Sequence, residues 1–132
     1  MKIGVPKEIK TQEYRVGLTP ESVMELTRAG HDVFVQTGAG LGLGATDADY
    51  LKSGATMLDT AADVFTTAEM IVKVKEPQPV ECAMLKPHHT LFTYLHLAAD
   101  KPQAEALMKS GAICIAYETV TNKAGRLPLL QP

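Results

Sequence analysis

The sequence lacks tryptophan and long apolar runs, and it has only three phenylalanines and two cysteines. No stretch approaches the ~20 apolar residues that cross a bilayer, and the start, "MKIGVPKEIK", lacks the apolar core of a secretory signal. A net charge of −2 gives no positive field for nucleic acid, and the sparse aromatics offer no surface for base stacking. We therefore expect a cytoplasmic protein that binds neither membranes nor nucleic acid.

The two thiols, Cys82 and Cys114, are few enough to fit a reducing compartment. Cys114 lies in the run "AICIAY", which is apolar on both sides of an extended chain, so we expect a buried free thiol. The 132 residues are 45% apolar and 21% charged, as in an ordinary globular domain. We expect a single domain over residues 1–132.

Three segments share one pattern, in which Lys or Arg stands two residues before a glycine and a β-prone run follows. They read "LTRAGHDVFVQ", "LKSGATML" and "LMKSGAICIAY". A cation favours the negative end of a helix, and glycine adopts the left-handed conformation that ends one. The pattern predicts three helix-to-strand units, with helices that end at Gly30, Gly54 and Gly111. Thr19 and Asp100 are the expected N-caps of the two best-defined helices.

Six short runs have the composition of strands, and several are apolar at successive positions, which is typical of strands buried on both faces. They read "KIGV", "DVFVQ", "TML", "MIVKV", "TLFTYL" and "AICIAYE". Strands that alternate with helices favour a parallel sheet. We predict an α/β fold with an open, mostly parallel sheet flanked by helices, of the flavodoxin-like or Rossmann-related type. Residues 119–132 lack periodicity, and we expect a connector that is cut short.

The segment "GAGLGLGA", residues 38–45, fits the glycine spacing of a dinucleotide-binding fingerprint, and Asp59 follows at the distance of a ribose-binding acid. In a true fingerprint the helix begins within the glycines, whereas here it is expected to begin at Thr46 or Asp47. No Lys or Arg occurs from 31 to 51, and Asp47 and Asp49 would repel phosphate. We therefore predict a turn without cofactor-binding residues, and we interpret Asp59 as the cap of the following helix.

Charged or polar side chains follow four of the predicted strands. Arg15 follows the first strand, Lys75 directly follows "MIVKV", His96 follows "TLFTYL" and Glu118 ends "AICIAYE". Ligands of open parallel sheets bind at the carboxyl ends of the strands, so the fold is expected to bring these four residues to one edge.

Each of these residues also fits an ordinary structural role. Arg15 could bind a carboxylate through its planar fork or lie free on an exposed loop. Lys75 could polarise a carbonyl oxygen, but Lys73 on the same strand face competes with it. His96 carries an imidazole, a side chain that commonly transfers protons in enzymes, although a single histidine at a strand end is often structural. Glu118 could orient a neighbour, but a surface ion pair is the simpler interpretation.

Two further features concern neighbouring side chains. Tyr94 shares the face of His96 if the strand continues, so it could shape the same pocket or pack as a half-buried strand aromatic. His88 and His89 are adjacent and would face opposite sides of a strand, and no Cys or carboxylate completes a ligand set beside them. We expect no metal site.

The whole chain resembles the N-terminal part of NAD-dependent alanine dehydrogenases. The resemblance is carried by "MKIGVPKEIKTQEYRVGLTPE", "GHDVFVQTGAGLGLGATDADY", "IVKVKEPQ", "LFTYLHLAAD" and "IAYETV…GRLPLL". Proton-translocating nicotinamide nucleotide transhydrogenases share the layout and an Arg-Val-x-Leu-Thr-Pro segment, but they are less similar at "LFTYLHLA".

The resemblance implies a two-domain oxidoreductase that converts L-alanine to pyruvate and ammonia with NAD. It implies that the NAD is bound mainly by a domain outside this chain. It also implies a homo-oligomer, which is a hexamer in the family. It implies that His96 is the acid/base and that Arg15 holds the substrate carboxylate. Lys75 would bind the carboxylate and carbonyl oxygen of pyruvate. Tyr94 and Glu118 would support them.

The chain departs from the family at its end, "LPLLQP", where the family has "LLTP" and continues into a long helix and the nucleotide domain. We therefore expect a fragment that carries the substrate-binding half of the site and is inactive alone. The alternatives are the N-terminal domain of a transhydrogenase-like protein and a non-catalytic assembly module.

Overall fold

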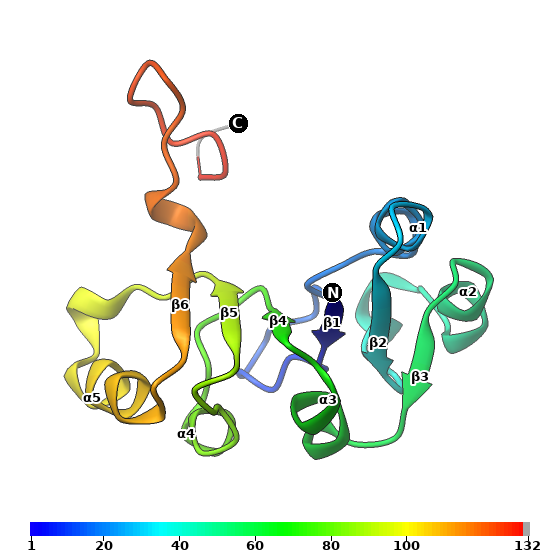
Figure 1. The fold of residues 1–132 in the computed structure, drawn as a ribbon, viewed down its shortest axis with the longest axis horizontal. Coiled ribbons are helices and arrows are strands. Elements are labelled where there is room, and N and C mark those ends of the chain that lie inside the picture. Colours follow the sequence, from blue (N-terminus) through cyan, green and yellow to red (C-terminus); the bar gives the residue numbers. More distant parts are fainter. Residues whose placement is uncertain (131–132) are drawn as a thin grey trace.

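The computed structural model describes residues 1–130, which form a six-stranded sheet with helices on both faces (Figure 1). All pairings are parallel, and the strand order is β3-β2-β1-β4-β5-β6. The strands are β1 (Lys2–Val5), β2 (Asp32–Gln36), β3 (Thr56–Leu58), β4 (Met70–Val72), β5 (Thr90–Thr93) and β6 (Ile113–Ala116). The predicted open parallel α/β fold is confirmed.

The helices alternate with the strands along the chain. They are α1 (Pro20–Arg28), α2 (Asp47–Lys52), α3 (Ala61–Thr67), α4 (Pro79–Cys82) and α5 (Lys101–Ser110), with short 3-10 turns η1 (Leu41–Leu43), η2 (Leu97–Ala99) and η3 (Tyr117–Thr119). In Figure 1, α1 lies on one face of the sheet, and α3, α4 and α5 lie on the other. Within residues 1–130, no helix is both long and apolar enough to pass through a membrane.

The helix ends follow from local hydrogen bonds. The Thr19 and Asp100 side chains accept from amides of the first turns of α1 and α5, as predicted. The expectation that Asp59 caps α3 is wrong, because Thr60 is the N-cap and its hydroxyl accepts from the Asp63 amide at 3.1 Å. The predicted stops at Gly30, Gly54 and Gly111 are confirmed by their φ values of 94°, 96° and 75°.

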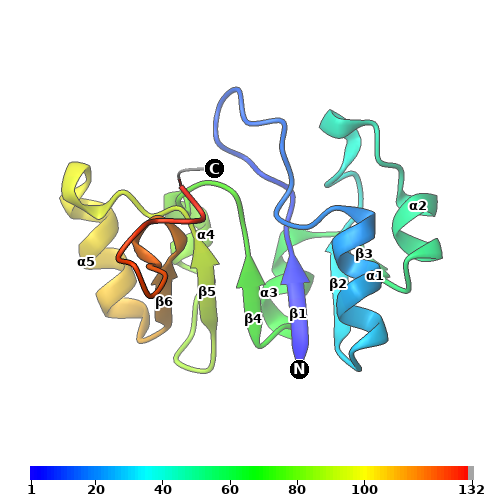
Figure 2. The same cartoon turned by 90° about the horizontal axis from the view of Figure 1, so that it is seen from above.

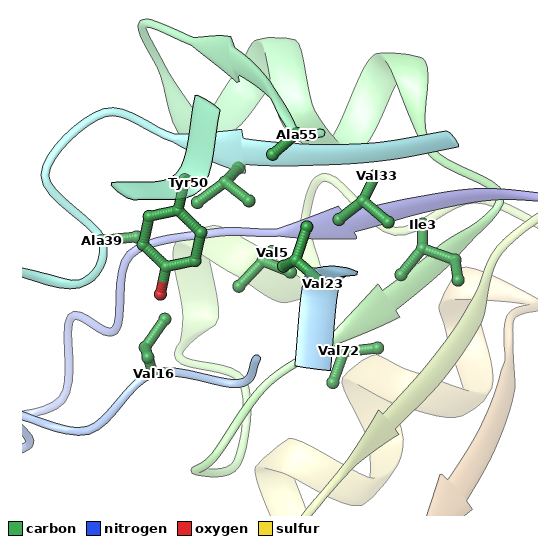
Figure 3. Packing of buried hydrophobic residues seen from close by; sticks show 10 residues of the cluster. Ile3, Val5, Val16, Val23, Val33, Ala39, Tyr50, Ala55 and Val72 are labelled. Carbon is green, nitrogen blue, oxygen red and sulfur yellow. The ribbon is translucent and has the colours of Figure 1, made fainter. Parts of the chain in front are cut away.

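Two apolar clusters hold the sheet to its helices. The first lies between β1, β2 and α1 and includes Val5, Val23, Val33 and the fully buried Tyr50 (Figure 3). The Tyr50 hydroxyl donates to the Leu18 carbonyl at 2.8 Å, and burial raises the pKa of Tyr50 to about 12. The second lies on the opposite face against α3, α4 and α5; among its members are Val64, Phe65, Ile71, Leu91 and Leu107.

His89 joins the second cluster as a buried structural side chain. Its Nε2 lies 2.6 Å from the Phe65 carbonyl oxygen, and its Nδ1 accepts from the Lys86 amide at 2.9 Å. Both contacts are satisfied by one neutral tautomer, with the proton on Nε2. His88 beside it is exposed. No group of three potential metal ligands occurs within residues 1–130.

The expectation that "AICIAY" is buried on both sides is wrong for one side of β6. Ile113 is 63% exposed and Ile115 is 38% exposed, and the free thiol of Cys114 is only partly buried. The cause is visible in Figure 1, where α5 lies on one side of β6 and no described helix lies on the other. Apolar composition alone does not show which face of an edge strand is covered.

Candidate active site

The carboxyl ends of β1, β4, β5 and β6 meet at one edge of the sheet, and the strand arrows visible in Figure 2 point toward it. From β1 the sheet is extended on one side by β2 and β3, and on the other side by β4, β5 and β6. The boundary between β1 and β4 is therefore the topological switch point, where open α/β sheets bind ligands. The segments that follow these four strands carry Arg15, Lys75, His96 and Glu118. The topology therefore gathers the four predicted residues at one edge.

Lys75, Tyr94 and His96 form one contact cluster. The Tyr94 hydroxyl lies 2.9 Å from Nδ1 of His96, and their rings stack with centroids 5.6 Å apart. The ammonium of Lys75 lies 5.1 Å from the centroid of the Tyr94 ring, in the range of a cation–π contact. Because Tyr94 binds Nδ1, the exposed His96 ring keeps Nε2 for a ligand.

Glu118 holds the main chain of His96 rather than a cation. Its carboxylate accepts from the amides of Leu95 at 3.1 Å and His96 at 2.7 Å. His96 has φ 47° and ψ 46°, the left-handed conformation that costs a non-glycine residue about 1–2 kcal/mol. The interpretation of Glu118 as a surface ion pair is wrong, because the carboxylate orients its neighbour instead. Such strain at a polar strand end is typical of functional sites.

Arg15 forms an ion pair with Glu13, a residue that the sequence analysis did not single out. The Glu13 carboxylate accepts hydrogen bonds from Nε of Arg15 at 2.9 Å and from Nη2 of Arg15 at 2.7 Å. This bidentate pair lowers the pKa of Glu13 to about 2, and the charge of Lys75 contributes. Two of the five guanidinium donors are used, so the 58% exposed Arg15 side chain keeps donors for a ligand carboxylate. A spacing of two residues could not reveal this pair, since it depends on a turn with a positive φ at Gln12.

The competition between the two lysines is decided by burial. Lys73 is 1% exposed, and its ammonium lies 3.0 Å from Glu8 and 3.2 Å from Glu81. Burial raises the pKa of Glu81, and the nearby ammonium opposes this rise. Lys75 is half-buried and makes no ion pair within residues 1–130. Lys75 is therefore the lysine that is free to bind a ligand.

Glu8 and Tyr117 hold the segment that carries Lys75, and neither was singled out from the sequence. Glu8 accepts from the Lys75 amide at 3.0 Å. The Tyr117 hydroxyl donates to the Val74 carbonyl at 2.8 Å, and its ring centroid lies 6.2 Å from that of Tyr94. Burial raises the pKa of Tyr117, and the nearby Arg15 charge partly opposes this rise. In the sequence, the only signals for these two residues are their places after predicted strands, Glu8 in "KE" and Tyr117 in "YE".

The glycine-rich turn has a different role from a phosphate cradle. Helix α2 begins after the glycines, with Thr46 as its N-cap and Asp49 completing a capping box. The Gly38 amide donates to the Asp47 carboxylate at 2.9 Å, so an acidic side chain occupies a donor that a phosphate would need. These bonds explain the turn without a nucleotide.

The parallel sheet and the polar groups at its carboxyl edge define an open α/β domain with a candidate ligand site. Residues 4–132 match the family described as "Alanine dehydrogenase/PNT, N-terminal domain", and the chain belongs to this family. Over all 132 residues, it is 55% identical to the alanine dehydrogenase of Halomonas elongata and 52% identical to that of Mycolicibacterium smegmatis. The chain spans 36% of the length of each of these relatives.

Solved structures give the same result. An L-alanine dehydrogenase superposes with a TM-score of 0.95 and 53% identity, over 98% of this chain and 36% of that one. A transhydrogenase from Sinorhizobium meliloti superposes with a TM-score of 0.86 and 31% identity, over 92% of this chain and 36% of that one. The predicted family resemblance is confirmed.

Proposed function

We propose that this chain is the substrate-binding half of an alanine dehydrogenase that interconverts L-alanine with pyruvate and ammonia. The observation that carries the proposal is the gathering of a guanidinium, an ammonium and an imidazole at one edge of the sheet, from Arg15, Lys75 and His96. The high identity to named alanine dehydrogenases over the whole chain supports the same reaction.

In this proposal Arg15 fixes the substrate carboxylate. Glu13 occupies one edge of the guanidinium, and the remaining donors match a carboxylate in a planar, bidentate arrangement. A fixed carboxylate restricts the orientation of Cα, and such positioning is a large part of catalysis.

Lys75 and His96 act on the polar atoms at Cα. The Lys75 ammonium stabilises negative charge that develops on the carbonyl oxygen as ammonia adds to pyruvate to form the carbinolamine, or as the carbinolamine releases ammonia and pyruvate. His96 exchanges protons through Nε2, because Nδ1 is bound by the Tyr94 hydroxyl. Glu118 keeps this imidazole at the strand end through the His96 amide.

The hydride that leaves Cα would pass to NAD, bound when the site is complete. The donors of the glycine-rich turn do not fit its pyrophosphate, because Asp47 and Asp49 surround the amino end of α2. We therefore place the nucleotide site in a domain outside residues 1–132, and we interpret residues 119–132 as the connector toward it. In keeping with the family resemblance, we also propose a homo-oligomer that works in the cytoplasm.

The test is a chimaera in which this chain replaces the matching segment of Halomonas elongata alanine dehydrogenase, to which it is 55% identical. We expect the chimaera to form NADH from L-alanine, and the isolated chain to form none. His96→Gln in the chimaera should lower kcat by roughly 10²–10⁴-fold, the range of general acid–base catalysis. A folded chimaera without alanine-dependent NADH formation would contradict the proposal.

A transhydrogenase-like function is the second candidate, because a transhydrogenase shares the fold at 31% identity. Such a domain needs no alanine site. Titration of the isolated, ¹⁵N-labelled chain with pyruvate separates the two candidates. Saturable shifts of the His96 and Leu95 amides favour the alanine dehydrogenase, and their absence together with an inactive chimaera favours the transhydrogenase.

A further inference from the structure

The glycine-rich turn touches the segment that carries Arg15. The α-carbon of Gly42 lies against Tyr14 so closely that an added Cβ would stand 2.9 Å from the Tyr14 Cβ and 3.0 Å from its carbonyl carbon, and closer still to its carbonyl oxygen. The obstacle is main chain, so it cannot rotate away as the end of a flexible side chain could. Any side chain at position 42 must therefore displace the peptide that joins Tyr14 to Arg15.

The other side of the turn is fixed to the core. A Cβ at Gly40 would stand 2.7 Å from the ring of Tyr50 and 2.8 Å from the Ala45 carbonyl oxygen. Figure 3 shows the Tyr50 ring beside Ala39, deep in the first apolar cluster. The Gly40 carbonyl accepts from the Leu43 and Ala45 amides at 3.0 Å. Gly40 and Gly42, which we call the glycine seat, thus connect the core to the Arg15 segment.

Glu13 fixes the same segment from within. Its side chain is only 6% exposed, and it accepts from the Arg15 amide at 2.9 Å as well as from the guanidinium. A cavity of about 250 Å³ is bounded by Glu13 and Arg15 on one side and by Gly38, Leu41 and Gly42 of the turn on the other. The glycine seat therefore contacts the main chain of this segment, and Glu13 binds both the main chain and the guanidinium of Arg15.

We infer that the glycine seat and Glu13 position the Arg15 guanidinium for a carboxylate ligand. The inference rests on the proposed function for the identity of that ligand, but not for the position of Arg15. It also explains why the segment imitates a nucleotide fingerprint. In both, glycine permits the close approach of a main chain, but here the approaching group is the Tyr14 peptide and not a pyrophosphate.

The test compares Gly42→Ala with Gly44→Asn in the full chain. Gly44 lies two residues further along, has a φ of 76° that asparagine tolerates, and has open space around its α-carbon. We follow the Nε–Hε resonance of Arg15, which reports its bond to Glu13, and the Kd for pyruvate by NMR titration. Gly42→Ala should shift and broaden this resonance and raise the Kd at least 10-fold. Gly44→Asn should leave the resonance in place and change the Kd less than 3-fold.

Glu13→Gln is the second variant, because it keeps the shape of the side chain and removes the charge. It should broaden the same resonance and raise the Kd for pyruvate at least 5-fold, with a circular dichroism spectrum like that of the wild type. In the chimaera, both variants should raise KM for L-alanine more than they lower kcat, a division that a general loss of structure would not produce.

The outcomes separate the inference from the proposed function. If the wild-type chain binds no pyruvate, the proposed function fails, and the Arg15 resonance alone decides the positioning role. An unchanged resonance and an unchanged Kd in folded Gly42→Ala would overturn the role of the glycine seat. A Gly42→Ala chain that does not fold would overturn it too, because the turn would then serve the core rather than Arg15.

Discussion

At the scale of single residues, hydrogen bonds to the main chain hold the candidate site in place. Glu118 accepts from the amides of Leu95 and His96, and Glu8 accepts from the amide of Lys75. Both carboxylates accept from the main chain of residues that could meet a ligand, so we expect them to position those residues. Their loss should change activity through geometry.

Glu118→Ala removes the acceptor that supports the left-handed conformation of His96. We expect the free energy of unfolding to fall by about 1–3 kcal/mol, since two amides lose a charged partner. In the chimaera, kcat should fall at least 10-fold, with partial recovery in Glu118→Gln, which keeps one oxygen acceptor. Glu105→Ala is the control, because Glu105 is exposed and only 3.9 Å from Lys101 in a surface pair. Equal kcat values in Glu118→Ala and Glu105→Ala would refute the positioning role.

Lys73→Ala leaves Glu8 and Glu81 buried without their shared cation. Breaking a buried pair in this way costs about 3–5 kcal/mol, and we expect this loss in the free energy of unfolding measured with urea. Lys75→Ala removes a lysine two residues away that makes no ion pair within residues 1–130, so its cost should stay below about 1 kcal/mol. Similar midpoints for the two variants would show that the buried cluster contributes no stability.

At the scale of elements, the sequence predicts helices and strands well because caps and apolar runs are local signals. Thr19 caps α1 as predicted, whereas the predicted strand "MIVKV" is shortened to Met70–Val72. The chain turns after Val72 because Lys73 and the amides that follow it bind Glu8, which lies 65 residues earlier. A contact between residues this far apart in the sequence cannot be predicted from local composition.

The candidate site likewise combines features that the sequence predicts with contacts that only the structure shows. The position of Arg15 at the carboxyl edge of the sheet was predictable from the topology of parallel sheets, but its ion pair with Glu13 was not, because that pair depends on the path of the loop after β1. The turn at Gly42 was recognisable as a turn, while its partner, the Tyr14 peptide, is visible only in three dimensions. The direction of strands can be read from sequence, and contacts between loops cannot.

His89 ties the turn before β5 to α3 and should make stability depend on pH. Burial lowers the pKa of His89 below its ordinary value of 6.5, so the unfolded chain takes up the proton first as the pH falls. The contribution of His89 to stability is therefore complete above pH 6.5 and is lost as the pH falls through 6.5 toward the lower pKa of the folded state. The slope cannot exceed about 1.4 kcal/mol per pH unit for one proton.

The measurement is the free energy of unfolding between pH 5 and 8. His89→Asn should flatten the dependence near pH 6, and the matched variant His88→Asn, at the exposed neighbour, should keep the slope of the wild type. A wild-type slope in His89→Asn would assign the dependence to other groups.

At the scale of the whole molecule, the two faces of the sheet are unequally covered. Helix α1 lies over β1 and β2 on one face, and α3, α4 and α5 cover the other face (Figure 1). Beyond the reach of α1, the side chains of β6 on that first face meet solvent within residues 1–130. The stability of the domain should therefore come mainly from the two apolar clusters and little from β6.

Two isoleucines of the same sheet test whether the buried clusters contribute more to stability than β6. Ile71 on β4 is fully buried, and Ile113 on β6 is 63% exposed. Ile71→Ala should lower the free energy of unfolding by about 2–5 kcal/mol, because it leaves a cavity in the second cluster. Ile113→Ala should cost less than about 1 kcal/mol, since most of its surface is already in water. Urea unfolding of both variants at low protein concentration measures the difference. A cost above 2 kcal/mol for Ile113→Ala would mean that this face is covered in solution, and a concentration-dependent cost would assign the cover to a second copy of the chain.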